Sequence, residues 1–394
     1  MTKSTLLHTL ALKAMKLAPP PPPYPSQEAN HPTREDSHPL KCTNPTSHAL
    51  AAHTTPPLSK NTALDATPSK SMPFFSLLIP VYNTESYIAR CLESCITQSF
   101  TDIEIFVIDD CGQDNAIEIA KDYASKDPRI QILHNPHNLG LFHTRGVGIK
   151  QARGKYILHV DSDDFIAPET CQRLYERITQ DYASSGVYSD ICCFGMDYYP
   201  KTFKRIRPVL ISQTLHKEQI KEDFFIKPST PPWHICAKAI KASIAQKANS
   251  FIKTSLRDLP PIIMAEDLLH FFIITLFAEK SIGLKEYLYF YCDNENSISR
   301  KTTLEILDKR IADSKLIINI FDKLKQLYSS TPTISQSINK IQHILKAAII
   351  LESRHTPHAF AYPIACLKSL TLHQKWQTYV RMLLYFISLG KLKL

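Results

Sequence analysis

Residues 156–165 read Tyr156-Ile-Leu-His-Val-Asp-Ser-Asp-Asp-Phe165, a short apolar run that ends in three carboxylates within four positions. The run follows Gly154-Lys155 and predicts a buried strand of a parallel sheet, with the acids at its carboxyl end. Ligands of open α/β sheets bind at that edge. Clustered carboxylates repel one another unless a cation relieves them, and Mg²⁺ or Mn²⁺ prefers oxygen ligands. Asp161-x-Asp163 therefore indicates a metal-assisted phosphate site rather than an ordinary acidic turn.

The segments before this stretch alternate between strand-like and helix-like patterns. The expected strands are 74–80, 103–108 and 130–133, and the expected helices are 85–99, 115–125 and 141–152, with Asp114 capping the second helix. This alternation predicts an α/β fold with a mainly parallel sheet covered by helices on both faces. Strand ends are followed by the polar loops Pro80-Val-Tyr-Asn83, Asp109-Asp110 and Asp161-Ser-Asp163, so we expect these loops to converge on one site.

The segments after residue 165 are expected to complete the sheet and to add a helical end. We expect a helix at 168–181, a strand at 190–194, an irregular stretch at 200–232, a short helix after Trp233–Lys238, an apolar helix at 264–277 and a strand at 282–291. From residue 303 the pattern predicts three helical segments, broken near 331–332 and 357–363.

The first 73 residues are expected to form a disordered, proline-rich leader. They hold 13 of the 27 prolines, mixed with small polar residues, and such a composition cannot bury enough apolar surface to offset the entropy of ordering. The alternative is that Pro19–Pro25 adopts polyproline II and docks on an aromatic groove.

Charge and cysteine content exclude several classes of protein. Residues 301–394 hold 14 Lys and Arg against 5 Asp and Glu, which accounts for the whole net charge of +9. Aromatic and basic residues do not interleave there as in nucleic-acid surfaces, so we expect no nucleic-acid partner. The ten cysteines form no CxxC pair, which favours buried reduced thiols in a reducing cytosol over a zinc site or disulfide scaffold. No segment approaches the roughly 20 apolar residues of a spanning helix, and no secretory signal is evident.

Five motifs, taken in order, resemble those of family 2 glycosyltransferases with the GT-A fold. They are Leu78-Ile-Pro-Val-Tyr-Asn83, Asp109-Asp110-x-x-x-Asp114, Asn138-x-Gly140 followed by Arg145, Asp161-Ser-Asp163-Asp164, and Glu266-Asp267. The resemblance covers residues 74–299 and implies a nucleotide-sugar half at 74–195 and an acceptor half at 196–299. Residues 300–394 are then a basic helical extension. The resemblance implies an inverting enzyme that uses a nucleotide-diphosphate sugar, expected to be UDP-linked, with Mn²⁺ or Mg²⁺.

The resemblance also assigns donor-binding residues within the first four motifs. These are Pro80, Val81, Tyr82, Asn83, Glu85, Asp110, Arg145, Asp161, Ser162 and Asp163. Tyr82 would stack on the base, unless it is a core tyrosine, and Asp110 would accept from the base N3–H. Arg145 would contact the base or the diphosphate, unless it is simply solvated. Asp163 would ligate the metal, with Asp161 at the ribose or a metal-bound water, and the ion would neutralise the departing diphosphate.

Inversion by single displacement needs a base on the acceptor side. The resemblance implies Asp267 for this role, with Glu266 as the alternative, because successive helical residues point about 100° apart. The alternative is that both acids are solvated and stand there only because negative charge is favourable at a helix N-terminus.

Trp233 and Lys238 resemble an acceptor-side segment, although Trp233 could equally be packed in the core. Two departures from the family pattern are Gln113 in place of a serine and Tyr291-Cys292 where relatives often carry an arginine.

The last segment has an amphipathic pattern. Trp376, Tyr379, Val380, Leu383, Leu384 and Ile387 repeat at helical spacing, flanked by Lys375, Arg381, Lys391 and Lys393. Such a helix suits peripheral membrane association through 372–394, although packing on the enzyme's own core is slightly favoured.

The sequence thus predicts a cytoplasmic hexosyl- or N-acetylhexosaminyl-transferase, at the inner face of the cytoplasmic membrane if it binds lipid. It would act on a glycan or lipid-linked acceptor in bacterial surface polysaccharide or lipo-oligosaccharide synthesis. Two alternatives are a phosphate-transferring hydrolase built on Asp161-x-Asp163 and a non-catalytic sugar-nucleotide-binding or scaffold protein of a glycan assembly complex.

Overall fold

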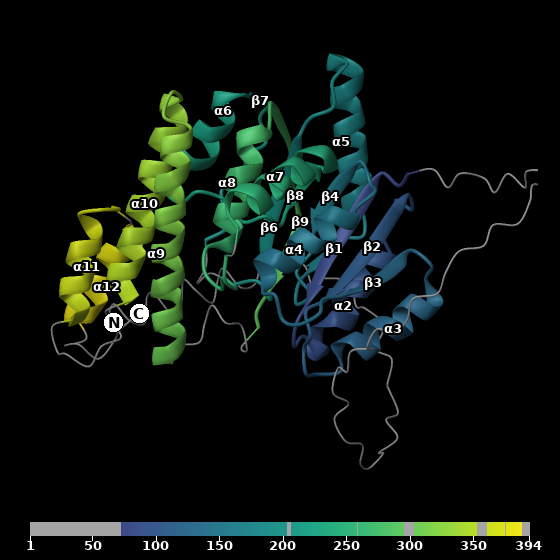
Figure 1. Ribbon diagram of the computed structural model, residues 1–394, viewed down its shortest axis with the longest axis horizontal. Helices are drawn as coiled ribbons and strands as arrows, with labels where there is room; N and C mark the ends of the chain where they lie inside the picture. The colour runs from purple at the N-terminus through teal and green to yellow at the C-terminus, as the bar shows by residue number, and fades with distance from the viewer. Residues whose placement is uncertain are drawn as a thin grey trace, which may run out of the picture. The chain divides into compact units, whose positions relative to one another are not determined.

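The computed structural model describes residues 72–202, 206–257, 259–294, 303–352, 361–374 and 376–387, and within these ranges it contains one nine-stranded sheet (Figure 1). The predicted leader and the loop 295–302 lie outside the described residues, apart from residues 72 and 73. The sheet order is β3-β2-β1-β4-β8-β6-β9-β5, and β7 pairs with β9. The strands are β1 Phe75–Val81, β2 Ile103–Asp109, β3 Ile130–His134, β4 Tyr156–His159, β5 Phe165–Ile166, β6 Ile191–Tyr199, β7 Leu215–His216, β8 Lys238–Lys241 and β9 Lys280–Cys292.

The first four strands of that order are parallel and form the half of the sheet that the sequence predicted. All seven residues of β1 are buried, as expected for a strand covered on both faces. Leu77 pairs with Ile105 of β2 on one side and with Leu158 of β4 on the other. The carboxyl ends of β1, β2 and β4 therefore meet at one edge, which confirms the predicted convergence of their loops.

The other half of the sheet is mixed. β8 runs antiparallel to both β4 and β6, while β6 runs parallel to β9. The prediction of a mainly parallel sheet is confirmed, and β8 is antiparallel to both of its neighbours. The prediction of an irregular stretch at 200–232 is wrong in part, because β7 and two short helices lie there.

Helices pack around the sheet. They are α2 Glu85–Ile96, α3 Ala116–Lys126, α4 Leu141–Gln151, α5 Thr170–Ser185, α6 Glu218–Lys221, the π-helix η1 Glu222–Ile226, α7 Ala242–Ser255 and α8 Glu266–Phe277. α2 buries Ile88, Cys91, Leu92 and Cys95, the stripe that its sequence predicts. α8 is apolar on every side and is buried accordingly from Leu268 to Thr275. The short helix expected after Lys238 is the longer α7.

The C-terminal region contains four described helices rather than the three predicted. They are α9 Leu304–Leu327, α10 Pro332–Glu352, α11 Ala361–Leu370 and α12 Trp376–Ile387. α9 is fixed to the loop before α8, where the Ile263 amide donates to Asp313 at 2.8 Å and Lys309 donates to the Pro261 carbonyl at 2.7 Å. None of the described helices is both long and apolar enough to cross a bilayer.

Candidate active site

The loops after β1 and β2 brace each other at the carboxyl edge of the sheet. Asn83 and Cys111 both have positive φ, and the Gln113 amide donates to Asn83 Oδ1 at 2.7 Å. Gly112 fits here because a Cβ at that position would lie 2.8 Å from the Asn83 amide nitrogen. Pro80 and Val81 belong to β1 itself and are buried. Tyr82 follows them at the edge of the sheet, and 43% of its surface is exposed.

Glu85 and Asp114 tie the starts of α2 and α3 together. The Glu85 amide donates to Asp114 at 2.7 Å, and the Asn115 amide donates to the Glu85 carboxylate at 3.1 Å. Asp114 also accepts from the Ala116 amide at 3.2 Å, so it caps α3 as predicted. Hydrogen bonds from Asn115 lower the pKa of Glu85. Glu85 therefore braces the rim of the site, and its predicted contact with the donor stays a prediction.

Asp110 shapes the turn that leads into α4. It is 3% exposed and accepts from the Leu139 amide at 2.8 Å, the Gly140 amide at 2.9 Å and the Asn135 side chain at 2.8 Å. Gly140 has a φ of +77°, which a residue with a side chain rarely adopts. The carboxylate thus holds the Asn138-Leu-Gly140 motif in place. Its predicted bond to a base N3–H stays a prediction.

α4 lies close to the sheet because it carries two glycines. A Cβ on Gly148 would lie 3.1 Å from the Leu78 and Ile108 side chains, and one on Gly146 would lie 2.8 Å from Asn249 Oδ1. This close approach holds Arg145, on the same helix, in the interior with 1% of its surface exposed. Arg145 is therefore not the solvated arginine that was the alternative.

Arg145 joins carboxylates that are distant in the sequence. Its Nη2 donates to Asp161 Oδ1 at 2.8 Å, and its Nη1 donates to Asp267 Oδ1. Glu266 Oε1 lies 4.0 Å from the same Nη1. Asp161 follows β4, whereas Glu266 and Asp267 begin α8. The structure thus brings three of the predicted acids together around one buried guanidinium, which contacts these acids rather than an exposed donor surface.

The two acids at the start of α8 differ in their partners. Asp267 is bonded to Arg145 and also accepts from the Ile235 amide at 3.4 Å, whereas Glu266 lies 4.0 Å from Arg145 and accepts a hydrogen bond from its own backbone amide. Burial, and then repulsion from Asp267, raises the pKa of Glu266 to about 7. Burial also raises the pKa of Asp267, and Arg145 opposes that shift. Both carboxylates therefore hold a proton more readily than a solvated acid does, as a general base at neutral pH requires.

Backbone strain is concentrated at the same place. Ala265, immediately before Glu266, has a φ of +60°, and Ala237, immediately before Lys238, has a φ of +56°. Neither residue is a glycine, so these conformations are held by their surroundings, as is common at functional sites.

The three acids after β4 point in different directions. Asp163 Oδ2 accepts from Asn294 at 3.0 Å, and the Asp163 carbonyl accepts from Arg90 at 2.6 Å. Ser162 is buried. Asp164 is 1% exposed and accepts from the Tyr289 hydroxyl and the Cys292 amide, both at 2.7 Å. Asp164 therefore anchors the end of β9, and the assignment of Asp161 and Asp163 to the metal site stays a prediction.

The sequence interpretation missed three residues that support these acids. Tyr289 accepts from the Asp161 amide at 3.1 Å while it donates to Asp164. Asn294 contacts Asp163, and Arg90 contacts its carbonyl. The polar Asn294, two residues after the end of β9, was the signal that could have pointed to this role.

The acids fit a divalent cation held mainly by a bound diphosphate. Burial raises the pKa of Asp163, and Asn294 and Arg90 only partly oppose that shift. No cluster of three or more possible metal-ligating side chains occurs among the described residues. Mg²⁺ and Mn²⁺ are commonly held by one or two carboxylates together with phosphate oxygens, so Asp163 and Asp161 suffice as protein ligands.

Lys238 does not line an exposed acceptor surface. It is 2% exposed, donates to the His234 carbonyl, and lies 4.7 Å from the centre of the Phe271 ring. Burial lowers the pKa of Lys238 to about 8. Its position in β8 explains why the prediction of direct acceptor contact is not supported. Trp233 is half-buried against the core, and its acceptor role stays a prediction.

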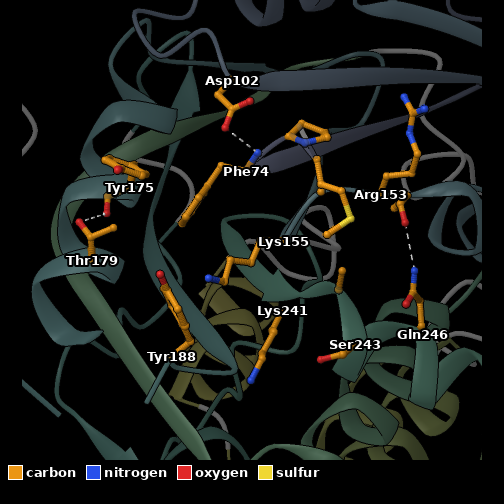
Figure 2. A pocket seen from close by; sticks show the side chains of 15 residues that line it. Phe74, Asp102, Arg153, Lys155, Tyr175, Thr179, Tyr188, Lys241, Ser243 and Gln246 are labelled. Atoms are coloured by element: carbon orange, nitrogen blue, oxygen red, sulfur yellow. Dashed lines mark hydrogen bonds between the residues drawn. The ribbon is translucent and has the colours of Figure 1, made fainter. Parts of the chain in front are cut away.

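Two cavities of the described chain lie away from these acids. Figure 2 shows a cavity of about 740 Å³ at the amino-terminal ends of β1 and β4, with Lys155 pointing toward Tyr188, whose ring centre lies 3.1 Å from the ammonium. A second cavity of about 450 Å³ lies between α4 and α7 and is lined by Phe142 and His270. Neither contains a carboxylate of the candidate site.

The chain is similar to several known proteins. Residues 76–246 match the model of glycosyl transferase family 2. The chain is 31% identical over 249 residues to the uncharacterized glycosyltransferase EpsJ of Bacillus subtilis, which covers 61% of this chain and 67% of that one. It is 30% identical over 130 residues to chondroitin synthase of Escherichia coli, covering 33% of this chain and 19% of the relative. The crystal structure of S. aureus TarS 1-349 in complex with UDP-GlcNAc shares the fold at 19% identity, with a TM-score of 0.50, over 80% of this chain and 88% of that one.

Proposed function

Because the chain belongs to glycosyltransferase family 2, we propose that it is an inverting enzyme that moves a sugar from a nucleotide-diphosphate donor to a hydroxyl group of a glycan or glycolipid. The observation that carries the proposal is the meeting of Asp161 with Asp267 around the buried Arg145. This contact supports a metal motif directly after β4 that acts together with a base on α8.

The donor is proposed to bind in the half formed by residues 74–195. Tyr82 would stack on the base at the edge of the sheet, and the braced loop of Asn83 would support it. Asp163, with Asp161, would hold Mn²⁺ or Mg²⁺, and such an ion stabilises a departing diphosphate as a Lewis acid. Arg145 is proposed to fix the Asp161 carboxylate in orientation rather than to bind the donor itself.

The reaction is proposed to be a single displacement. The acceptor hydroxyl oxygen forms a bond to the anomeric carbon while the bond from that carbon to the diphosphate oxygen breaks, and the hydroxyl proton passes to a carboxylate. Asp267 is the proposed base because Arg145 and the Ile235 amide hold it in a fixed orientation. Glu266, whose pKa is higher, is the alternative.

The acceptor is proposed to belong to bacterial surface polysaccharide or lipo-oligosaccharide synthesis. A relative named chondroitin synthase supports a glycan acceptor. The proposed location is the cytoplasm, and a lipid-linked acceptor would bring the enzyme to the inner membrane surface through residues 372–394. Trp233, in the half formed by residues 196–299, is the proposed acceptor contact.

A panel of nucleotide sugars tests this function. The full-length protein is heated with UDP-, GDP- and other nucleotide-linked sugars, each with and without Mn²⁺, and the unfolding temperature is recorded. We expect one donor to stabilise the protein only when Mn²⁺ is present, because ligands that bind the native state raise its stability. Stabilisation by no nucleotide sugar, with or without the ion, would refute the proposed donor class.

A further inference from the structure

The last described helix exposes a continuous apolar stripe. The exposed fractions are 53% for Tyr379, 39% for Val380, 58% for Leu383, 56% for Phe386 and 69% for Ile387. These positions follow the spacing of one helix face. The sequence slightly favoured packing of this stripe on the enzyme's core, and that interpretation is wrong, because the stripe faces away from the described chain.

Helix α11 also exposes apolar side chains. α11 exposes Ile364 and Leu367, at 47% and 54%, while a different set of its side chains, including Cys366 and Leu370, is buried. The rings of Tyr362 and Tyr385 stack at 4.9 Å and connect α11 to α12. α11 therefore already has a buried face, and its exposed apolar residues are additional. The name docking face is used below for Ile364, Leu367, Tyr379, Val380, Leu383, Phe386 and Ile387.

The charge of this end of the chain indicates what covers the docking face. Residues 353–394 contain six Lys and Arg and no Asp or Glu. Lys368 and Arg381 lie on α11 and α12, the same helices that carry the docking face. A basic helix pair with an exposed apolar face matches a membrane surface that carries anionic lipids. A second copy of the chain would bring an equally basic surface, so charge repulsion opposes self-association there.

We propose that α11 and α12 together dock the enzyme on an anionic lipid surface, with the docking face in the boundary between headgroups and acyl chains. The helices lie on the membrane and do not cross it, consistent with the lack of a spanning helix among the described residues. The exposed Lys368, one helical turn from Ile364 on α11, contacts the lipid phosphates. The proposal extends the predicted segment 372–394 to include α11, and it does not depend on the identity of the donor.

Vesicle sedimentation of the full-length protein tests the docking face. The vesicles are either phosphatidylcholine alone or phosphatidylcholine mixed with phosphatidylglycerol. We expect the protein to sediment with the mixed vesicles and Leu383→Glu/Phe386→Glu to bind them at least about tenfold more weakly, since it places charge in the apolar boundary. The matched control is Leu304→Glu/Leu327→Glu on α9, which replaces leucines that are 72% and 62% exposed and should bind like the wild type.

A charge variant separates lipid electrostatics from simple apolar adhesion. Lys368→Glu should weaken binding to mixed vesicles, whereas Lys315→Glu on α9 should bind them like the wild type. Circular dichroism and unfolding temperature verify that each variant is folded. Equal binding by the Leu383→Glu/Phe386→Glu protein and the wild type, or no preference for anionic vesicles, would overturn the proposal. A concentration-dependent dimer that the same variant abolishes, without vesicle binding by the wild type, would also overturn it and assign the surface to self-association.

Discussion

Replacing Arg145 with methionine removes the cation shared by the carboxylates of the candidate site. Arg145 is 1% exposed, and Asp161 and Asp267 are bonded to it directly. Removing one partner of a buried ion pair costs about 3–5 kcal/mol, because the remaining charges are left without compensation. The side chains of Asp161 and Asp267 keep 26% and 23% of their surface exposed. Water therefore screens part of the loss, and we expect about 3 kcal/mol at neutral pH.

The loss should depend on pH with a definite sign. Without Arg145, which opposes the effect of burial, the pKa of Asp267 rises further above its value in the unfolded chain. A group whose pKa is raised in the folded state favours folding at low pH, and this contribution is lost as the pH rises through its folded pKa. The destabilisation of Arg145→Met should therefore be largest near pH 7.5 and should shrink toward about pH 5, as Asp267 takes up a proton.

Urea denaturation of the wild type and the variant at about pH 5 and about pH 7.5 measures both effects. The matched control is Arg173→Met, since Arg173 pairs with Glu286 at 2.7 Å but is 44% exposed. An exposed pair contributes about 0–1 kcal/mol, so this control should change little. An unchanged free energy of unfolding for Arg145→Met near pH 7.5, or an equal loss at both pH values, would refute the assignment of Arg145 as the shared counter-ion.

Three further changes test individual residues of the site. Asp267→Asn should leave donor binding intact and lower turnover by about 10² or more, the usual scale for a general base, and near-normal turnover would point to Glu266. Because the pKa of Glu266 is raised to about 7 from 4.5, the wild-type free energy of unfolding should fall by up to about 3 kcal/mol as the pH rises from about 5 to about 7.5. Glu266→Gln should remove most of that slope in denaturation experiments, and an unaltered slope would assign it to other groups. Tyr82→Ala should weaken donor binding in calorimetry by about 1–3 kcal/mol through lost stacking, with an unchanged unfolding temperature; unchanged affinity would exclude the stacking role.

The first half of the fold could be predicted from local patterns. β1, β2 and β4 are continuous apolar runs that end in polar loops, and the stripe of α2 is periodic. The stretch 200–232 carries no such signal. Its elements are short, and η1 is held by Phe224 and Phe225, whose rings pack on α8 with centroids about 5 Å from those of Phe271 and Phe272. The antiparallel direction of β8 is likewise a tertiary property that local sequence does not encode.

The candidate acids were predictable as individual residues, but their partners were not. Arg145 reads locally as a helix arginine, and its bonded acids lie 16 and 122 positions away. Asp163 and Asp164 are adjacent and chemically identical, yet only the second meets Tyr289 and the end of β9. Lys238 was assigned to the acceptor side by resemblance, and nothing in its local sequence context shows that it enters a buried strand. Long-range contacts decide all three roles.

Titration calorimetry with the stabilising nucleotide sugar tests the central claim, that the acids after β4 hold the ion that the donor diphosphate requires. With the wild type we expect binding in the presence of Mn²⁺ and little binding after the ion is chelated. With Asp163→Ala we expect that dependence on Mn²⁺ to disappear together with the affinity. Unchanged affinity of Asp163→Ala for the donor in the presence of Mn²⁺ would contradict the account.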